Sequence, residues 1–287
     1  MAIILGGNTS IYLGAPPAPP APVSDPDAQA FLTAAAITNP TIRTAVNQLV
    51  IDLKAYSIWT KMKAIYPFVG GTASTHKFNL RNPLDTDAAF RLTFFGGWVH
   101  STTGAKPNGT NAYAETYFVP SVELTTNFGS AHYYSRTGTP EPTAGDANGI
   151  VIGARATAAN DTFALTIKTT PSNFTQFFFS ASGTTTNQFA RFIDTLGTGF
   201  YSGALSVTGS KIYRNGINTT STNLSFTRNT PNVSLYIGAI NNKNTGPTDL
   251  TSKESALAAI GDSLTDTENA NYNLAVTAFE TTLGRNV

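Results

Sequence analysis

The sequence predicts a mainly β protein, a jelly-roll sandwich that follows a helical segment and ends in a C-terminal helix. From residue 76 onward, short apolar runs recur about every 10 to 15 residues with Gly, Asn and Pro between them, as in sandwich strands and turns. Only 12% of the residues are charged, well below the usual share, so Thr, Asn and Ser must keep the surface polar. Asn215–Gly216 favours a tight type I′ hairpin turn, because both central positions of that turn need positive φ.

Composition limits the size of the protein and its possible functions. The 287 residues are enough for one large domain with a substantial core. The net charge is +1 and the Lys and Arg residues are scattered, so we expect no nucleic-acid partner. Cysteine is absent, which excludes disulfides and thiolate metal sites, and no apolar stretch reaches the length of a membrane span. We expect no cofactor and no bound metal.

Residues 1–23 have the layout of an anchoring peptide followed by a spacer. The segment Ala15–Val23 is so rich in proline that it favours polyproline II, and it would span roughly 28 Å as a semi-rigid linker. We expect the apolar residues before it to dock into another protein. These residues are Ile3, Ile4, Leu5, Ile11, Tyr12 and Leu13. The alternative is an N-terminus without a role.

Residues 24–70 are expected to form a helical segment. Asp25–Pro26 supplies a cap and a first-turn proline, and Thr38–Asn39–Pro40 interrupts the pattern and restarts it, with Thr38 or Asn39 as the cap. Apolar residues then recur at helical spacing as far as Met62, which predicts helix up to residue 65. This apolar stripe is best explained by packing against the domain that follows.

Residues 71–287 are expected to form the jelly roll. Its strands are expected at Phe78–Leu80, Phe90–Phe94, Trp98–His100, Ala112–Phe118, His132–Tyr134, Ile150–Ile152, Phe163–Ile167, Gln176–Phe179, Gly199–Tyr201, Lys211–Arg214 and Ser234–Gly238. Neighbouring side chains on a strand point to opposite faces, so Tyr133 and Tyr134 must point in opposite directions.

The C-terminal helix is expected from Asp266 to Leu283. Thr265, with Glu268 three residues later, is a capping-box pattern, and an acidic first turn suits the positive end of the helix dipole. The residues expected on the buried face of this helix are Leu274, Ala275, Ala278 and Phe279.

The segment Gly261–Leu264 permits two interpretations. Its Gly-Asp-Ser-Leu sequence resembles the nucleophile block of the GDSL family of lipases and esterases, which would make Ser263 a nucleophile. A serine nucleophile needs a base, and that family takes its histidine from an Asp-x-x-His block near the C-terminus. The histidines of this chain are His76, His100 and His132. All of them precede Ser263 and none lies in such a block, so we favour a turn before the C-terminal helix.

Three segments together resemble the second half of concanavalin A-like (laminin G-like) jelly rolls. Lys211–Gly216 resembles the Leu-Tyr-x-Asn-Gly hairpin of that superfamily, and Leu235–Ala239 resembles the strand that follows it. Ala258–Glu268 resembles the closing Leu-Ser-Asp-Glu-Glu corner. The order and spacing of the three segments agree with the superfamily over residues 70–287. The resemblance implies a concanavalin A-like sandwich that serves as a binding or structural module.

The N-terminal half resembles poorly annotated structural proteins of tailed and other bacteriophages. The resemblance is carried by Asp25–Phe31, Ile58–Gly71 and Thr75–Leu80. That family pairs a helical segment with a jelly roll, and its members are generally regarded as virion or appendage proteins. The resemblance implies a location in the virion for this chain.

The strand region lacks the carboxylate pattern of the glycosidases in that superfamily. Those enzymes carry Glu-x-Asp-x-Glu on one strand, because alternate residues face the same glycosidic bond. Here Asp85 and Asp87 are the only strand-like pair before the C-terminal corner, and they lie in a turn. We expect both to be solvated, with a partial calcium site that includes Asn82 as the alternative. The three histidines are expected to have structural or surface roles.

Glycan binding needs exposed aromatic rings that stack on sugar faces, together with amides or carboxylates for the sugar hydroxyls. We expect such a site in the loop around residues 104–113. The residues expected to form it are Trp98, His100, Asn108 and Tyr113. Most other aromatic residues should belong to the core, since half of each strand points inward.

These observations predict a non-enzymatic bacteriophage virion protein, such as a head fibre, spike or tail appendage. Residues 1–23 would dock into a capsid or tail protein and hold the jelly roll outward, as a homo-oligomer with a trimer favoured. The outer loops would bind host-surface glycans. Two alternatives remain open: a hydrolase or esterase that acts on surface polysaccharide, and a bacterial adhesin.

Overall fold

The computed structural model describes residues 24–124, 128–140, 149–156, 161–180, 189–206, 209–220, 230–243 and 245–287. The expected anchoring peptide, with Ile3, Ile4, Leu5, Ile11, Tyr12 and Leu13, lies outside the described residues.

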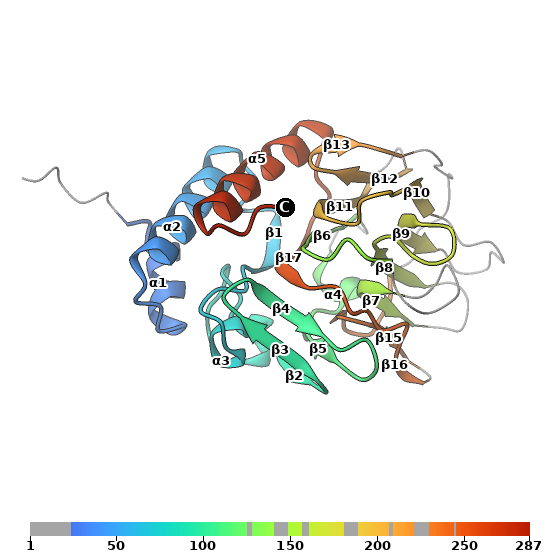
Figure 1. The fold of residues 1–287 in the computed structure, drawn as a ribbon, viewed down its shortest axis with the longest axis horizontal. Coiled ribbons are helices and arrows are strands. Elements are labelled where there is room, and N and C mark those ends of the chain that lie inside the picture. The colour runs from blue at the N-terminus through green and yellow to red at the C-terminus, as the bar shows by residue number, and fades with distance from the viewer. Residues whose placement is uncertain are drawn as a thin grey trace, which may run out of the picture.

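The described chain is built in three layers (Figure 1). Helices α1, α2 and α5 cover one face of a first sheet, here called the inner sheet, and a second sheet, here called the outer sheet, packs against its other face. The helices are α1 (Pro26–Ala34), α2 (Pro40–Ala55), α3 (Ala73–His76), α4 (Pro120–Glu123) and α5 (Asp266–Thr282), with a 3-10 turn η1 (Asp87–Ala89). None of the described helices is both long and apolar enough to cross a membrane.

Both sheets are formed by strands that are distant in the sequence. In the inner sheet the order is β13-β12-β11-β6-β17-β4-β3, with β1 paired to β17. In the outer sheet it is β10-β9-β8-β7-β14-β5-β2, with β15 beside β7 and β16 beside β15. The inner strands are β1 (Met62–Tyr66), β3 (Trp98–Ser101), β4 (Gly104–Pro107), β6 (Ser130–Ser135), β11 (Gly199–Ser206), β12 (Gly209–Arg214), β13 (Ile217–Asn218) and β17 (Ser255–Gly261). The outer strands are β2 (Thr93–Phe95), β5 (Tyr113–Glu115), β7 (Ile150–Arg155), β8 (Thr162–Thr166), β9 (Phe174–Ser180), β10 (Phe189–Ile193), β14 (Tyr236–Ile237), β15 (Ile240–Asn242) and β16 (Gly246–Thr248). Two large antiparallel sheets that pack face to face confirm the predicted mainly β sandwich.

Alternation along the inner strands divides the apolar residues between two cores. On β6, Tyr133 lies in the core between the sheets and Tyr134 in the core beneath the helices, as predicted. On β17, Ile260 faces the outer sheet and Leu257 faces the helices. The central strands β6 and β17 of the inner sheet are therefore buried on both faces, whereas the outer sheet turns one face away from the sandwich core.

The predicted caps and turns are present. Asp25 accepts a hydrogen bond from the Asp27 amide at the start of α1, and Asn39 does the same for Ile42 at the start of α2. The capping box of α5 forms as predicted, and Asn215 and Gly216 have φ values of 50° and 75°, as a type I′ turn requires.

The prediction of helix up to residue 65 is wrong after Ala55. Met62–Tyr66 is strand β1, which pairs antiparallel with β17, so that Tyr66 lies opposite Ala258. The apolar spacing near Met62 fits a helix, but a partner strand far along the chain decides the outcome. The predicted strand Phe78–Leu80 is also absent, although the Leu80 amide donates a hydrogen bond to the Ile65 carbonyl.

The predicted buried face of α5 is partly wrong. Ala275 and Phe279 are buried as predicted, but Leu274 is 57% exposed and Ala278 is exposed. The core beneath the helices instead takes Tyr272 and Val276, together with Ala275 and Phe279. The inner sheet meets the helix on the side that carries these four residues, which places Leu274 in solvent.

Arg285, in the segment after α5, anchors that segment to the protein interior through buried hydrogen bonds. Its guanidinium donates to both carboxylate oxygens of Glu280, at 2.8 and 3.0 Å, and to the carbonyl oxygens of Phe68 at 3.0 Å and Ala256 at 3.3 Å. Arg285 is 2% exposed and Glu280 is fully buried. The C-terminal segment, the end of β1 and the start of β17 are thus joined by one side chain.

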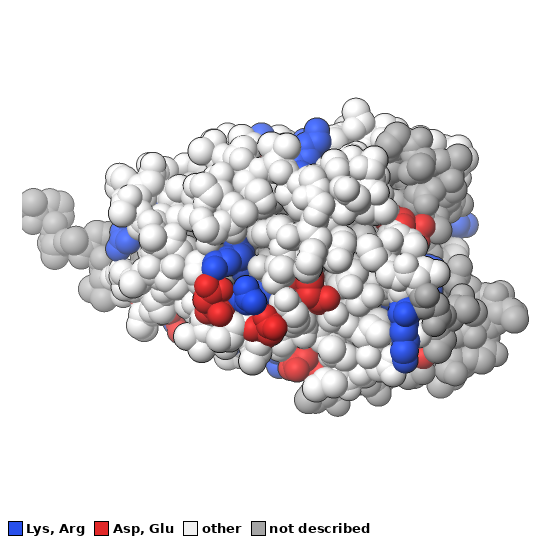
Figure 2. Space-filling view, turned by 90° about the horizontal axis from the view of Figure 1, so that it is seen from below, with Lys and Arg blue, Asp and Glu red and all other residues white. Residues whose placement is uncertain are grey.

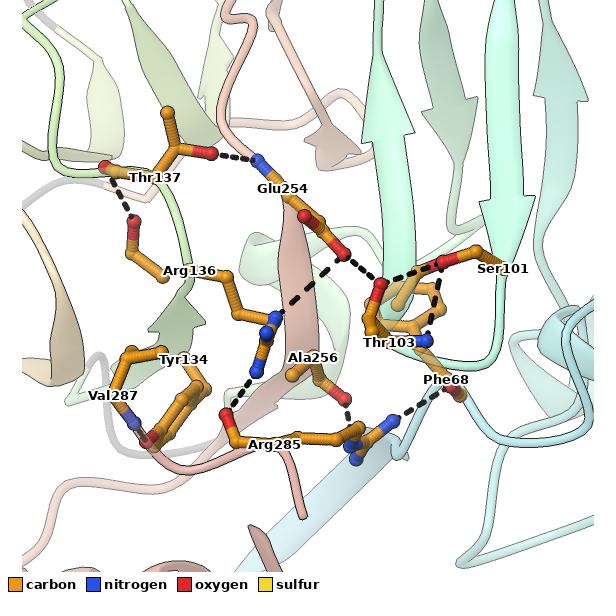
Figure 3. Close-up of polar contacts among 12 residues, drawn as sticks. Phe68, Ser101, Thr103, Tyr134, Arg136, Thr137, Glu254, Ala256, Arg285 and Val287 are labelled. Atoms are coloured by element: carbon orange, nitrogen blue, oxygen red, sulfur yellow. Dashed lines mark hydrogen bonds and ion pairs between the residues drawn. The ribbon is translucent and has the colours of Figure 1, made fainter. Parts of the chain in front are cut away.

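A second arginine extends this network toward the surface (Figure 3). Arg136, which follows β6, donates a hydrogen bond to the Arg285 carbonyl and forms an ion pair with Glu254 at 3.7 Å. Glu254 also accepts a hydrogen bond from the Thr103 hydroxyl at 2.6 Å. The network joins the β3–β4 turn to the C-terminal segment, and its partners are protein groups, which indicates a structural role.

Candidate functional site

Three aromatic rings stack across the face of the outer sheet that points away from the sandwich core. We call Phe95, Tyr113 and Tyr236 the aromatic strip; they lie on the neighbouring strands β2, β5 and β14. The ring of Tyr113 stacks on Phe95, with centroids 4.9 Å apart, and on Tyr236, with centroids 4.6 Å apart. The adjacent residues Phe94, Ala114 and Ile237 belong to or pack against the sandwich core, so alternation turns the strip outward.

The strip is accessible at its edge. Phe95 is 42% exposed, and β2 is the last strand of the outer sheet. One face of the Phe95 ring meets Tyr113, and no other described ring stacks on its second face. Exposed aromatic rings of this kind mark interaction sites on soluble proteins, because burial of their apolar surface against a ligand is favourable.

Polar groups surround the carboxylate of Glu115, which lies on the same face of β5 as Tyr113. The Tyr117 amide donates to the Glu115 carboxylate at 2.8 Å, and the hydroxyls of Ser234 and Tyr236 also hydrogen-bond to it. Burial raises the pKa of Glu115, and these hydrogen bonds oppose the rise. Burial, followed by the charge of Glu115, raises the pKa of Tyr236 to about 12, so that its hydroxyl stays protonated and can donate.

A hollow of about 260 Å³ lies at the outer edge of β2. Its lining includes Lys77, Arg91 and Thr93. The two basic side chains are paired with carboxylates: Lys77 with Asp85 at 2.5 Å, and Arg91 with Asp87 at 2.9 Å. Figure 2 likewise shows basic and acidic side chains side by side on a surface that is mostly uncharged. Asp85 and Asp87 are exposed to solvent, as expected, and they also neutralise neighbouring cations.

Of the four residues predicted for a glycan site, only Tyr113 belongs to the aromatic strip. Trp98 lies at the sandwich edge, where its indole N–H donates to the Tyr113 carbonyl at 3.2 Å and its ring packs edge-on against Phe94. Trp98 thus supports β5 from behind the strip.

The side chain of Asn108 organises a turn. Its Oδ1 accepts hydrogen bonds from the amides of Thr110, Asn111 and Ala112, and its Nδ2 donates to the Asn111 side chain at 2.8 Å. These contacts are typical of an Asx turn that shapes the loop between β4 and β5.

His100 faces His76, a contact that their separation in the sequence does not suggest. The Gly71 amide donates to Nε2 of His76 at 3.2 Å, so the proton of neutral His76 lies on Nδ1 and is donated to Nδ1 of His100 at 3.0 Å. Burial, followed by the charges of His100 and Arg285, lowers the pKa of His76 to about 3, and burial lowers the pKa of His100. Both rings are therefore neutral near pH 7, and they join α3 to β3.

Ser263 makes no hydrogen bond with a histidine in the part of the chain that the structure describes. His132 is instead buried beneath α5, where Nδ1 contacts the Ser202 hydroxyl and Nε2 lies 2.8 Å from the Ser130 oxygen. The Ser130 hydroxyl donates to the Asp262 carbonyl, so Nε2 of His132 is the donor to Ser130. Ser263 Oγ is buried without a hydrogen-bond partner among the described residues.

Phe95, Glu115 and Tyr236 were not among the residues predicted for the site. Alternation along the predicted strand Ala112–Phe118 would place Glu115 on the same face as Tyr113, so that signal was available, whereas Phe95 lies one residue beyond the predicted strand Phe90–Phe94. Nothing local shows that Tyr236 lies beside Tyr113, because β5 and β14 become neighbours only in the folded sheet.

No protein-family model and no curated protein matches the chain. Among solved structures, one is domain 4 of AbnA in complex with arabinotriose; AbnA is an extracellular GH43 arabinanase from Geobacillus stearothermophilus. It matches 74% of this chain and 98% of its own, with a TM-score of 0.48 and 13% identity. A mutant Trypanosoma rangeli sialidase matches 81% of this chain and 39% of its own, with a TM-score of 0.48 and 9% identity. The NanB sialidase of Streptococcus pneumoniae matches 51% of this chain, with a TM-score of 0.41 and 14% identity, and this chain spans 24% of that protein.

Proposed function

We propose that this protein is a non-enzymatic saccharide-binding module and that the aromatic strip is its binding surface. The observation that carries the proposal is the outward stack of Phe95, Tyr113 and Tyr236 next to a cluster of hydroxyl groups. The site predicted around residues 104–113 is retained only at Tyr113, which lies in the middle of the stack.

The chemistry of a sugar ring suits such a surface. A pyranose has an apolar face of C–H groups, which stacks on an aromatic ring, and a rim of hydroxyls, which need hydrogen-bond partners. The open face of Phe95 offers the first kind of contact. Hydrogen bonds to the sugar hydroxyls can come from the hydroxyls of Tyr113, Tyr117 and Tyr236. The Tyr117 hydroxyl is already positioned by a hydrogen bond of 2.9 Å with the Thr93 hydroxyl. Stacked rings on a sheet lose little side-chain entropy on binding, which favours affinity.

Replacement of Phe95 or Tyr113 by alanine is expected to weaken saccharide binding by roughly tenfold or more, because each change removes a stacking surface. Binding is measured on a glycan array and then by calorimetry with the best glycan found. Ile217→Ala is the matched control, since Ile217 is 69% exposed on strand β13 of the other sheet and should leave affinity unchanged. Equal affinities for wild type, Phe95→Ala and Tyr113→Ala would refute the strip as the binding surface.

We also propose that the module is displayed on a bacteriophage particle, as a head fibre, spike or tail appendage. The proposal is supported by the resemblance of Asp25–Phe31 and Ile58–Gly71 to virion proteins, and by the proline-rich spacer in residues 1–23. Its trimeric state and its capsid or tail partner stay predictions.

Deletion of residues 1–23 is expected to leave a folded domain that no longer joins particles, because the two large cores are formed by residues between Ala28 and Phe279. Particle incorporation is followed by immunoblot of purified virions, and folding by circular dichroism. Incorporation at the level of the full chain would refute the anchoring role.

The esterase alternative has its own test. If the chain hydrolysed an ester and Ser263→Ala abolished that activity, the non-enzymatic part of the proposal would fail. The hydrogen bonds of His132 to Ser202 and Ser130, and its burial, favour a structural role for this histidine.

A further inference from the structure

We infer that the ligand of the aromatic strip is an uncharged saccharide, and that Glu115 is the specificity-determining residue that disfavours sialic and uronic acids. This inference rests on the proposed function, since it concerns the ligand class of the same surface. It follows from the position of Glu115, from its hydrogen bonds, and from the charges around it.

The register of the outer sheet places Glu115 at the centre of the proposed site. On one side it lies opposite Thr93 of β2, and on the other side opposite Tyr236 of β14. Tyr113 precedes it by two residues on the same face, which corresponds to roughly 7 Å along the strand. A saccharide that stacks on the open face of Phe95 and also reaches the Tyr117 hydroxyl, which is bound to Thr93 beside Glu115, therefore extends toward the carboxylate.

The hydrogen bonds of Glu115 leave its charge in place. Its donors are the Tyr117 amide, at 2.8 Å, and the hydroxyls of Ser234 and Tyr236. A carboxylate has about four lone-pair sites, so these three donors occupy most of its acceptor capacity. All three donors are neutral. Glu115 thus orients Tyr236 and the Tyr117 turn without needing a donor from the ligand, and it contributes a net negative charge to the site.

The basic side chains at the edge of the site do not cancel this charge. Lys77 and Arg91, at the hollow beside Thr93, are each paired with an aspartate, Asp85 or Asp87. Arg91 also forms a second ion pair, with Asp85 at 3.6 Å, so the two cations and the two carboxylates form one neutral cluster. The carboxylate of an acidic sugar would meet Glu115 with no uncompensated cation from this cluster to offset the repulsion.

Like charges at this spacing set the expected size of the effect. For two carboxylates on the order of 10 Å apart near a protein surface, the repulsion corresponds to roughly tenfold weaker binding of the acidic sugar. The repulsion must fall with added salt, because mobile ions screen charges that are exposed to solvent.

The experiment uses the full chain and a glycan array that carries each neutral glycan beside its sialylated and its glucuronic acid-capped form. For the best matched pair, calorimetry then gives the ratio of neutral to acidic affinity at about 0.05 M and about 1 M NaCl. We expect a ratio of roughly ten or more at low salt, and a ratio several-fold smaller at high salt. Glu115→Gln should bring the ratio close to one, whatever it does to the neutral affinity itself.

The outcomes separate the inference from the proposed function. Binding of acidic forms as tightly as their neutral partners, with loss of both in Phe95→Ala, would keep the function and overturn the inference. A preference for neutral glycans that neither salt nor Glu115→Gln alters would show steric selection and would also overturn it. If no glycan binds, or if Phe95→Ala binds like wild type, the proposed function fails and the inference fails with it. Should Glu115→Gln not fold, the salt dependence of the wild-type ratio decides alone.

Discussion

Replacement of Arg285 by alanine is expected to lower the free energy of unfolding by about 3 to 5 kcal/mol, the cost of breaking a buried ion pair from one side. The change leaves the Glu280 carboxylate fully buried without its bidentate partner. It also removes the donors to the carbonyls of Phe68 and Ala256. Arg285 connects three segments that are distant in sequence, so its loss should also loosen the C-terminal segment from β17.

The measurement is equilibrium unfolding in urea, followed by circular dichroism. A double variant, Arg285→Met with Glu280→Leu, removes both charges and is expected to lose less stability than Arg285→Ala alone, because no unpaired charge remains buried. Lys211→Ala is the surface control: its ion pair with Asp266 is largely exposed, so the cost should stay below about 1 kcal/mol. A cost for Arg285→Ala as small as that of the control would contradict the assigned role of the pair.

Acid is expected to destabilise the protein strongly, starting near pH 6.5, because two histidines are buried in their neutral forms. Burial lowers the pKa of both His76 and His132 to about 3 in the folded protein, from the ordinary histidine value of 6.5. Between these values the unfolded chain binds the protons and the folded chain does not, so stability falls as the pH falls. Each histidine contributes about 1.4 kcal/mol per pH unit in that range.

Unfolding free energies measured between about pH 7.5 and pH 5 test this expectation, a window that avoids most carboxylate titration. His76→Gln removes one of the two histidines, so it should reduce the slope of the unfolding free energy against pH by about 1.4 kcal/mol per pH unit. This change in slope is expected even if the variant is less stable than the wild type at neutral pH. A free energy that stays constant across the window would contradict neutral, buried histidines.

Local signals in the sequence correctly predicted the helix starts and the tight turn. The caps at Asp25, Asn39 and Thr265, and the turn at Asn215–Gly216, depend on hydrogen bonds and dihedral angles within a few residues. Such features are decided by neighbours in the chain and are therefore visible before the fold is known.

Predictions that depended on distant partners failed or were incomplete. Met62 fits a helical pattern, yet β17 supplies the edge that makes it part of a strand. Leu274 fits a buried helix face, yet the inner sheet contacts the opposite side of α5. In both cases the sequence gives two acceptable local solutions, and burial of apolar surface against a distant element selects one.

The candidate site shows the same division. The sequence by itself determined that the chain is a mainly β sandwich with capped helices, and that Tyr113 lies on a strand next to a turn. Only the tertiary structure decided that Tyr113 stacks between Phe95 and Tyr236, and that His100 faces His76. The physical reason is that strand alternation fixes which face a side chain takes, whereas the order of strands in a sheet fixes its neighbours, and that order depends on long-range pairing.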